Sequence, residues 1–335
     1  MSRLPWLPWK QTIGLLLLGL GLMGAFGLSL AIGPERLSGE DLWQAALHQG
    51  DAVHQALLWD VRLPRTLVAL MAGAGLGMSG ALMQGMLRNG LADPFLLGIS
   101  AGAALTAVAL LTLGLFLSWV PLAAWLGAMV TTLIVYLLAR TRAGLSSERL
   151  ILAGVAVNSL LGSVTTTLLL LADQRVHAAL NWLNGSLNGR TWADVTVAGP
   201  YLLGGLIAGT LLARPVNLLS LGDDLAVGLG VTLNRTRLLI GGVAALLAAG
   251  TATVAGLVGF VGLVVPHGVR MIVGTDYRWV LPLSAVAGGL LVILADTIAR
   301  SSPIELPVGV ITSLVGAPMF VWLLYRRSQG KETHR

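Results

Sequence analysis

Residues 62–84 read RLPRTLVALMAGAGLGMSGALMQ, and they decide the fold class. From Thr66 to Leu87 the chain runs for 22 positions without a charged residue. A membrane-spanning helix needs about 20 apolar residues, so this run is long enough to cross a bilayer. A spanning segment must be a helix or part of a closed barrel, because lipid offers the backbone no hydrogen-bond partner. The run does not alternate in polarity, which indicates a helix.

Similar apolar runs recur along the chain. Of its 335 residues, 56% are apolar and 11% are charged, whereas a soluble domain carries about 25% charged residues. The mean hydropathy is +0.83. We therefore expect an all-α membrane protein with about ten transmembrane helices, forming a single domain over residues 1–335. The expected spans are 11–32, 66–87, 95–117, 121–139, 150–171, 195–213, 238–257, 259–273, 280–299 and 306–325.

The first apolar run has two interpretations. It follows Lys10, and Ser29-Leu30-Ala31 offers a small-x-small site, as in a signal peptide. The run is also long enough to span a membrane and is followed by many further spans. This favours a retained first helix.

The basic residues orient the chain. With the N-terminus inside, the inner connections hold 15 of the 21 lysines and arginines and the outer connections hold 6. Basic residues gather on the cytoplasmic side of membrane proteins. The sequence thus predicts cytoplasmic N- and C-termini, and the net charge of +6 reflects contact with membrane lipid and topology rather than nucleic acid.

Several kinds of chemistry are missing from the sequence. A phosphate-binding loop needs G-x-x-x-x-G-K-[ST], but near Lys331 the positions of the first Gly and the Ser/Thr are taken by Tyr325 and Glu332. The five histidines lack metal-ligand spacing, and cysteine is absent. We expect no catalytic residue, no bound metal and no cofactor in this chain. A membrane enzyme would need clustered catalytic groups.

An ion-coupled secondary carrier would need ionisable groups near the bilayer midplane. Asp296 is the one deep acidic candidate, and it lies four residues before Arg300. An i,i+4 ion pair accounts for it. The sequence therefore disfavours this class of transporter.

Four segments carry a family resemblance. They are the stretch 62–84, LRNGLADPFLLGISAG at 87–102, GLVGFVGLVVPHGVRMIVGTDYR at 256–278 and ELPVGVITSLVGAPMFVW at 305–322. Together and in this order they resemble the iron-chelate and cobalamin uptake permeases, often called the FecCD family. One departure is Asn89-Gly90-Leu91, where the family usually has Asn-Pro-Leu, so the fixed φ of proline is lost there.

The resemblance implies an ABC importer permease of the bacterial inner membrane. It implies cytoplasmic ATPase subunits that hydrolyse ATP on separate chains, and a periplasmic substrate-binding protein that delivers the ligand. It also implies a second copy of the permease or a similar permease, so the choice between homodimer and heterodimer stays open.

Three arginines at the outer ends of spans are candidates for docking the binding protein: Arg62, Arg65 and Arg300. A guanidinium fork suits a carboxylate. In permeases of this family, arginines at matching positions meet acidic residues of the binding protein. The alternatives are anchoring to lipid phosphates and the ion pair with Asp296.

The inner connection 217–237 resembles the segment that couples these permeases to their ATPases. Asp223 and Asp224 suit the first turn of a short helix. Gly228 and Gly230 then permit a sharp turn. The predicted coupling residues are Gly222, Asp223, Asp224, Gly228, Leu229 and Gly230, and the alternative is an ordinary surface loop.

The fifth span carries small polar residues that are candidates for the translocation path: Asn158, Ser159, Gly162, Thr165 and Thr166. Spacings of three and four put Asn158, Gly162, Thr165 and Thr166 on one helical face. Such residues also pack helices together, so the residues alone leave both roles open. In this family the helix lines the path, which favours translocation.

The ligand is the least determined feature. Residues 182–192, WLNGSLNGRTW, look most like the ferric-siderophore branch of the family. Haem and cobalamin remain alternatives, because the binding protein sets much of the selectivity.

Overall fold

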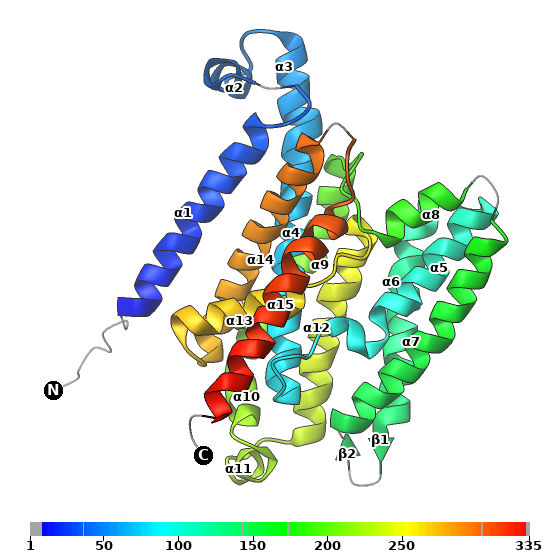
Figure 1. The fold of residues 1–335 in the computed structure, drawn as a ribbon, viewed down its shortest axis with the longest axis vertical. Coiled ribbons are helices and arrows are strands. Elements are labelled where there is room, and N and C mark those ends of the chain that lie inside the picture. Colours follow the sequence, from blue (N-terminus) through cyan, green and yellow to red (C-terminus); the bar gives the residue numbers. More distant parts are fainter. Residues whose placement is uncertain are drawn as a thin grey trace.

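The computed structural model describes residues 9–35, 37–141, 144–145, 147–172, 175–302 and 304–332. Within this part, seven helices are long and apolar enough to cross a membrane, and three shorter apolar helices join them. These ten helices coincide with the ten predicted spans, which confirms an all-α membrane fold (Figure 1). They are α1 (Trp9–Ala31), α4 (Leu63–Leu87), α5 (Ile99–Leu113), α6 (Val120–Ala139), α7 (Ser147–Leu170), α9 (Trp192–Leu211), α12 (Leu233–Ala255), α13 (Val261–Val273), α14 (Tyr277–Ser301) and α15 (Val308–Glu332).

Helix α4 forms the centre of the bundle and packs most extensively against α14 and α12. Its small residues allow this approach. A Cβ atom added at Gly73 would overlap the backbone of Gly288, and one added at Gly77 would overlap the carbonyl of Ser284. Because the two backbones touch directly, dispersion contacts replace the side-chain layer of an ordinary helix pair.

Three connecting elements precede α4 at the end of the molecule that the basic residues predict to be outer. They are α2 (Gly39–Ala46), α3 (Ala52–Ala56) and the π-helical turn η1 (Leu57–Arg62). A capping box starts α2, since Ser38 and Asp41 bond reciprocally. Hydrogen bonds from Ser38, and to a smaller extent the charge of His54, hold the pKa of Asp41 below its ordinary value.

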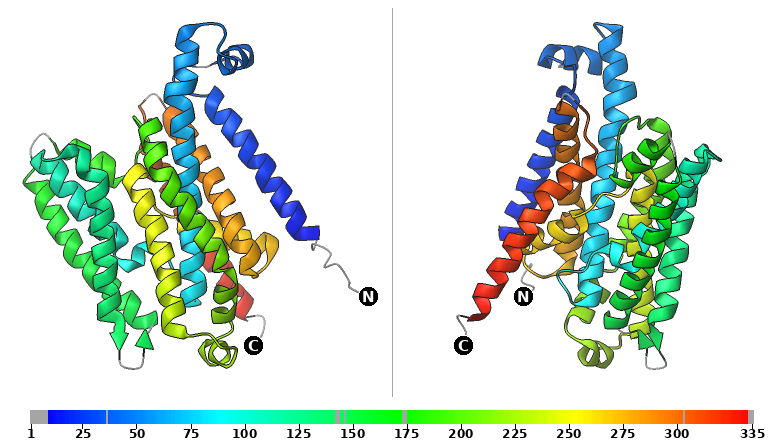
Figure 2. Two further views of the ribbon diagram at one scale, coloured as in Figure 1. Left: turned by 180° about the vertical axis from the view of Figure 1, so that it is seen from behind. Right: turned by 45° about the vertical axis from the view of Figure 1, so that its right-hand side comes forward.

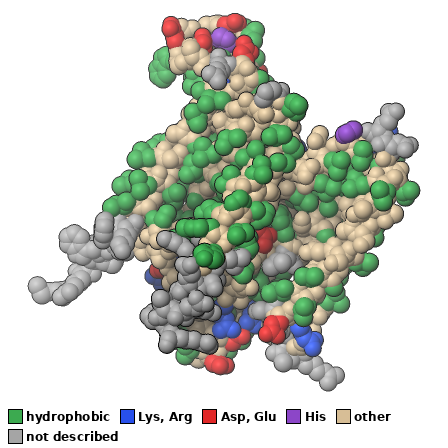
Figure 3. Space-filling model, in the orientation of Figure 1, with side chains coloured by type: hydrophobic (Ala, Val, Ile, Leu, Met, Phe, Trp, Pro, Cys, Tyr) green, Lys and Arg blue, Asp and Glu red, His purple; other side chains and the backbone are tan. Residues whose placement is uncertain are grey.

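The opposite end carries a two-stranded hairpin, β1 (Arg140–Thr141) and β2 (Gly144–Leu145), and the short helices α10 (Ala213–Ser220) and α11 (Asp223–Gly228). The C-terminal end of α15 points towards the same end (Figure 1). Hydrophobic side chains cover the middle of the molecule, and charged ones gather at its two ends (Figure 3). Of the arginines used to orient the chain, Arg3, Arg36, Arg142 and Arg335 lie outside the described residues.

The eighth span is a short helix that begins inside the bundle. Helix α12 ends at Ala255, and an irregular segment with positive φ at Gly256 and Phe260 leads into α13. A Cβ added at Gly80 of α4 would overlap the backbone of Gly262, so α13 starts directly against the central helix. The predicted span 259–273 is short, and the structure forms it as a 13-residue helix that begins after a break.

Helices α5, α6 and α7 stand together as a group at one side of the molecule (Figures 1 and 2). Short helical segments enter and connect this group: η2 (Pro94–Leu97), η3 (Leu117–Trp119) and α8 (Val176–Leu183). Gly90 stands where the family usually has proline. It does not adopt a backbone conformation that requires glycine, because its φ is not positive. The Asn89 side chain holds this turn by accepting from the amide of Leu91 at 3.0 Å.

Candidate docking, coupling and translocation sites

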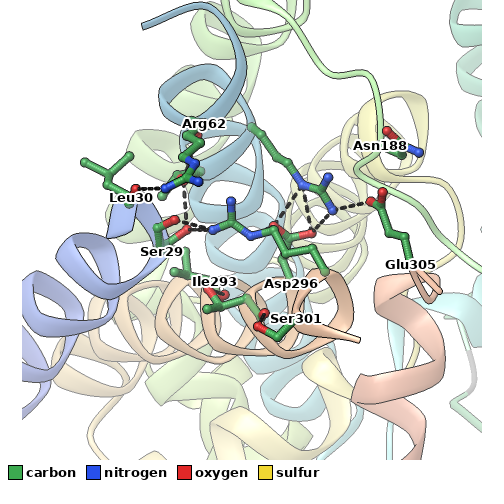
Figure 4. Close-up of polar contacts among 12 residues, drawn as sticks. Ser29, Leu30, Arg62, Asn188, Ile293, Asp296, Ser301 and Glu305 are labelled. Carbon is green, nitrogen blue, oxygen red and sulfur yellow. Dashed lines mark hydrogen bonds and ion pairs between the residues drawn. The ribbon is translucent and has the colours of Figure 1, made fainter. Parts of the chain in front are cut away.

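Arg65 forms the centre of a buried polar cluster at the end of the molecule that is predicted to be outer. Its Nε lies 3.1 and 3.0 Å from the two carboxylate oxygens of Asp296, and its Nη2 lies 2.7 Å from one of them. A second carboxylate, from Glu305, also approaches Nη2 to 2.7 Å. One guanidinium thus joins α4, α14 and the connection before α15 (Figure 4).

Arg300 and Arg62 extend this cluster to α1. Arg300 donates to the hydroxyl of Ser29 at 2.6 Å and to the Ser29 carbonyl, and it lies 3.6 Å from Asp296. Arg62 donates to the carbonyls of Leu30 at 2.6 Å and Ala31 at 2.9 Å, and also to Glu35. The sequence foresaw the Asp296–Arg300 pair but missed the closer partner Arg65, which lies 231 residues away.

All three predicted docking arginines are therefore buried. Arg62, Arg65 and Arg300 are 2%, 9% and 4% exposed. Their hydrogen bonds and ion pairs go to carboxylates, carbonyls and the Ser29 hydroxyl of this chain (Figure 4). In this geometry they hold four segments together, namely α1, η1 with α4, α14 and the connection before α15. Direct contact with a binding protein stays a prediction.

The predicted coupling segment contains the short helix that the acidic pair indicated. Asp223 and Asp224 lie in the first turn of α11, after Gly222 with φ +112°. Asp223 accepts from Arg237 of α12 at 2.8 Å and lies 3.7 Å from Arg88 at the end of α4. These ion pairs connect the segment to two spanning helices.

The turn after α11 differs from the expectation at one glycine. Gly230 has φ +85°, which only glycine adopts without strain, whereas Gly228 does not have positive φ. The sharp turn therefore depends on Gly230. Leu225, Val227 and Leu229 are 61%, 55% and 59% exposed, so this end of the chain presents apolar side chains outward.

The five translocation candidates divide between two faces of α7. Ser159 and Thr166 are exposed, and a Cβ added at Gly162 would meet no atom within 4 Å. Thr165 is 5% exposed and lies on the packed face instead. Asn158 is half-buried and donates to the carbonyl of Phe95 at 3.3 Å.

Hydroxyl groups of the open α7 face bond to their own helix. Ser163 donates to the carbonyl of Ser159 at 2.9 Å, and Thr166 donates to that of Gly162 at 3.0 Å. The donors of these hydroxyls are satisfied within α7, so they need no partner from a neighbouring helix.

A cavity beside α15 went unnoticed at the level of sequence. It measures about 520 Å³ and is lined by Asn184, the irregular segment at Leu257, and Gly309, Ser313 and Pro318 of α15. A Cβ at Gly309 would overlap the carbonyl of Asn184, so this glycine lets α15 approach the connection after α8. Gly309, Ser313 and Pro318 belong to the motif at 305–322, but the sequence does not show that they line a cavity, because its other walls come from Asn184 and Leu257.

Comparison with known proteins places these features in a family. Residues 21–326 match the FecCD transport family. The chain is 42% identical to the cobalamin import system permease protein BtuC of Halobacterium salinarum over 82% of this chain and 74% of that protein. It is 39% identical to the hemin transport system permease protein HmuU of Yersinia pestis, over 94% and 93%. A solved metal-chelate type ABC transporter in an inward-facing conformation superposes with a TM-score of 0.84 at 32% identity, covering 93% of this chain and 98% of that one.

Proposed function

This chain belongs to the FecCD transport family, and on that premise we propose that it carries a ferric siderophore across the bacterial inner membrane. Members of the family are transmembrane permease subunits of ABC importers, and ATP is hydrolysed on a separate chain. The importer class covers iron chelates, haem and cobalamin. The assignment of a ferric siderophore, rather than haem or cobalamin, is our proposal.

The open α7 face supports the choice of a siderophore. It offers hydroxyl groups near Ser159, Ser163 and Thr166. Neither residues 158–167 nor the described lining of the cavity beside α15 contains a lysine or arginine. A haem carries two carboxylates, which guanidinium groups would hold best. A chelate that presents neutral polar oxygens fits this lining better, in agreement with the resemblance of residues 182–192.

Haem is the second candidate, because the hemin permease aligns over 94% of this chain. The deciding experiment reconstitutes the permease with its ATPase and binding protein in proteoliposomes. We expect ATP-dependent uptake of a ferric hydroxamate, with little uptake of hemin or cobalamin. Uptake of hemin in preference to the hydroxamate would overturn the ligand assignment and leave the importer class intact.

We infer that a second copy of this permease covers the α7 face. In the isolated chain, 17% of the residues in the most apolar part of α7 are buried, which leaves surface for a partner or for lipid. The hydroxyls of Ser159, Ser163 and Thr166 favour a partner, because two such faces could enclose a polar path between two copies. Cross-linking of cysteines placed at Ser159 and Thr166 tests this, and efficient cross-links between chains are expected at one or both positions. Failure of both to cross-link in a functional complex would contradict it.

We propose that α11 contacts the ATPase through its exposed apolar residues. Gly230→Ala forces a side chain into the left-handed region, at a cost of about 1–2 kcal/mol. We expect ATP hydrolysis that no longer depends on the binding protein, together with reduced uptake. Gly228→Ala is the matched control, since Gly228 lacks positive φ and its Cβ would meet open space. Equal transport by both variants would refute the coupling role of this turn.

The docking role of the outer arginines can be separated from their structural role. Arg65→Lys keeps the charge but loses the fork that grips Asp296. Direct docking predicts weaker association with the binding protein at an unchanged Tm. A supporting role predicts a lower Tm with unchanged association of the folded fraction, which is the result that the buried geometry favours.

A further inference from the structure

An apolar pocket of about 330 Å³ lies between α6 and α12 near the inner end of the bundle. Met86 of α4 and Leu97 of η2 form its buried floor. Its volume is at the lower end of small-ligand sites, which measure roughly 300–1,000 Å³. It is separate from the α7 face and from the cavity beside α15, so the transport function does not account for it.

Two glycines of α12 create this pocket. A Cβ added at Gly242 would meet no atom within 4 Å, and one added at Gly241 would first meet the Met86 sulfur at 3.7 Å. Any larger residue at either position would extend into the space between the helices. The opening therefore depends on side chains that are missing from one wall.

The pocket opens onto a surface of hydrocarbon character. Leu133 and Leu137 of α6 and Leu238 of α12 form the rim and are 56%, 57% and 52% exposed. The hydroxyl of Thr132 in the lining already donates to the Ala128 carbonyl at 2.8 Å. An occupant therefore meets almost no unsatisfied polar group, which suits an alkyl chain.

The inner mouth of the pocket is basic. Arg237 lines it and pairs with Asp223. Three exposed arginines lie close in sequence to lining residues. Arg140 follows α6, Arg149 precedes Leu150, and Arg235 lies on α12. In the described part of the chain these three form no ion pair with a carboxylate within 4.0 Å.

The depth of the pocket matches a lipid leaflet. From Arg237 to Ala245 the α12 wall rises eight residues, or about 12 Å at 1.5 Å per residue. One leaflet of hydrocarbon is about 15 Å thick, half of the 30 Å core. A chain inserted beside Gly242 would therefore place its headgroup at the level of the arginines.

We propose that this pocket binds one acyl chain of an anionic phospholipid, whose phosphate lies against Arg140 and Arg235. The apolar slot selects the hydrocarbon, and the basic mouth selects the charge. Anionic lipids gain roughly fivefold in affinity for each basic residue near the surface, so two arginines give about a thirtyfold preference over a zwitterionic lipid.

The test measures bound lipid on the full-length permease by native mass spectrometry, after titration with phosphatidylglycerol or phosphatidylcholine. Gly242→Leu fills the slot, and we expect it to remove the bound phosphatidylglycerol. Gly204→Leu is the matched control, because Gly204 is an exposed glycine of α9 with open space beside it. Loss of lipid in both variants, or in neither, would contradict the binding of an acyl chain in this pocket.

The charge requirement has its own control. Arg140→Gln with Arg235→Gln should bind phosphatidylglycerol about thirtyfold more weakly and phosphatidylcholine unchanged. Arg214→Gln with Arg278→Gln removes two exposed arginines elsewhere at the same end and should leave both affinities unchanged. An equal loss of phosphatidylglycerol affinity in the two double variants would contradict the binding of the phosphate by Arg140 and Arg235. A Gly242→Leu protein that changes from dimer to monomer with its lipid retained would show that a second copy, not lipid, fills the slot.

Discussion

Helices α4 and α7 are both apolar spans with many small residues, chiefly glycine in α4 and serine and threonine in α7, but their surroundings are opposite. In the most apolar window of the span that contains α4, 83% of the residues are buried inside the chain, against 17% for α7. Small residues in α4 let two backbones touch, whereas most of those in α7 lie on a surface that no other helix of the chain covers. Small residues therefore serve packing in α4, while passage of a ligand along α7 stays a prediction.

Swapping a glycine for leucine in each helix tests this contrast most strongly. Gly77→Leu drives a side chain into the α14 backbone at Ser284, and we expect it to cost more than the about 1–3 kcal/mol of ordinary overpacking. Gly162→Leu in α7 meets open space and should leave the folded yield unchanged while obstructing uptake. Yield and Tm in detergent measure the first effect and proteoliposome uptake the second. Equal destabilisation by the two changes would break the comparison.

Removing the charge partner on α4 should have the next largest effect. Arg65→Ala leaves Asp296, which is 1% exposed, without its closest cation. Breaking a buried pair in this way costs about 3–5 kcal/mol. Adding Asp296→Ala removes the unpaired carboxylate but also the ion pair of Arg300, so it should recover part of that cost, as measured by titration with a denaturing detergent. A double variant no more stable than the single one would contradict the pairing.

A matched pair of serines provides the finest test. Ser79 of α4 donates across to the Ala244 carbonyl of α12 at 2.7 Å, whereas Ser163 of α7 donates to its own helix. Ser79→Ala should cost about 0.5–1.5 kcal/mol. Ser163→Ala should change stability by less than about 0.5 kcal/mol. The reverse order in the same denaturation assay would place the interhelical contact on α7 rather than α4.

Much of the fold could be predicted because lipid imposes simple requirements. The ten spans, including the short one at 259–273, follow from apolar length. The first turn of α11 follows from Asp223 and Asp224, because acidic residues stabilise the positive end of a helix. Each of these features depends on residues close together in the chain.

The site residues were harder to interpret because their roles depend on distant partners. Asp296 was paired in the sequence with Arg300, one turn away, while its bidentate partner Arg65 comes from another helix. Thr165 and Thr166 are adjacent, and the packing of α7 against α5 and α6 buries one and exposes the other. Spacing gives the face on which a residue lies, but it does not identify what that face meets.

By itself the sequence determined that this chain crosses a membrane about ten times, lacks the motif to bind ATP and belongs among uptake permeases. Hydropathy, missing lysines and ordered motifs are properties of the chain alone. The tertiary structure decided that the outer arginines are buried, which side of α7 is open and where glycines leave a slot between α6 and α12. These outcomes depend on which helices approach one another. In lipid, close packing and polar pairing decide this, because nearly all the helices are hydrophobic and hydrophobicity alone does not distinguish between them.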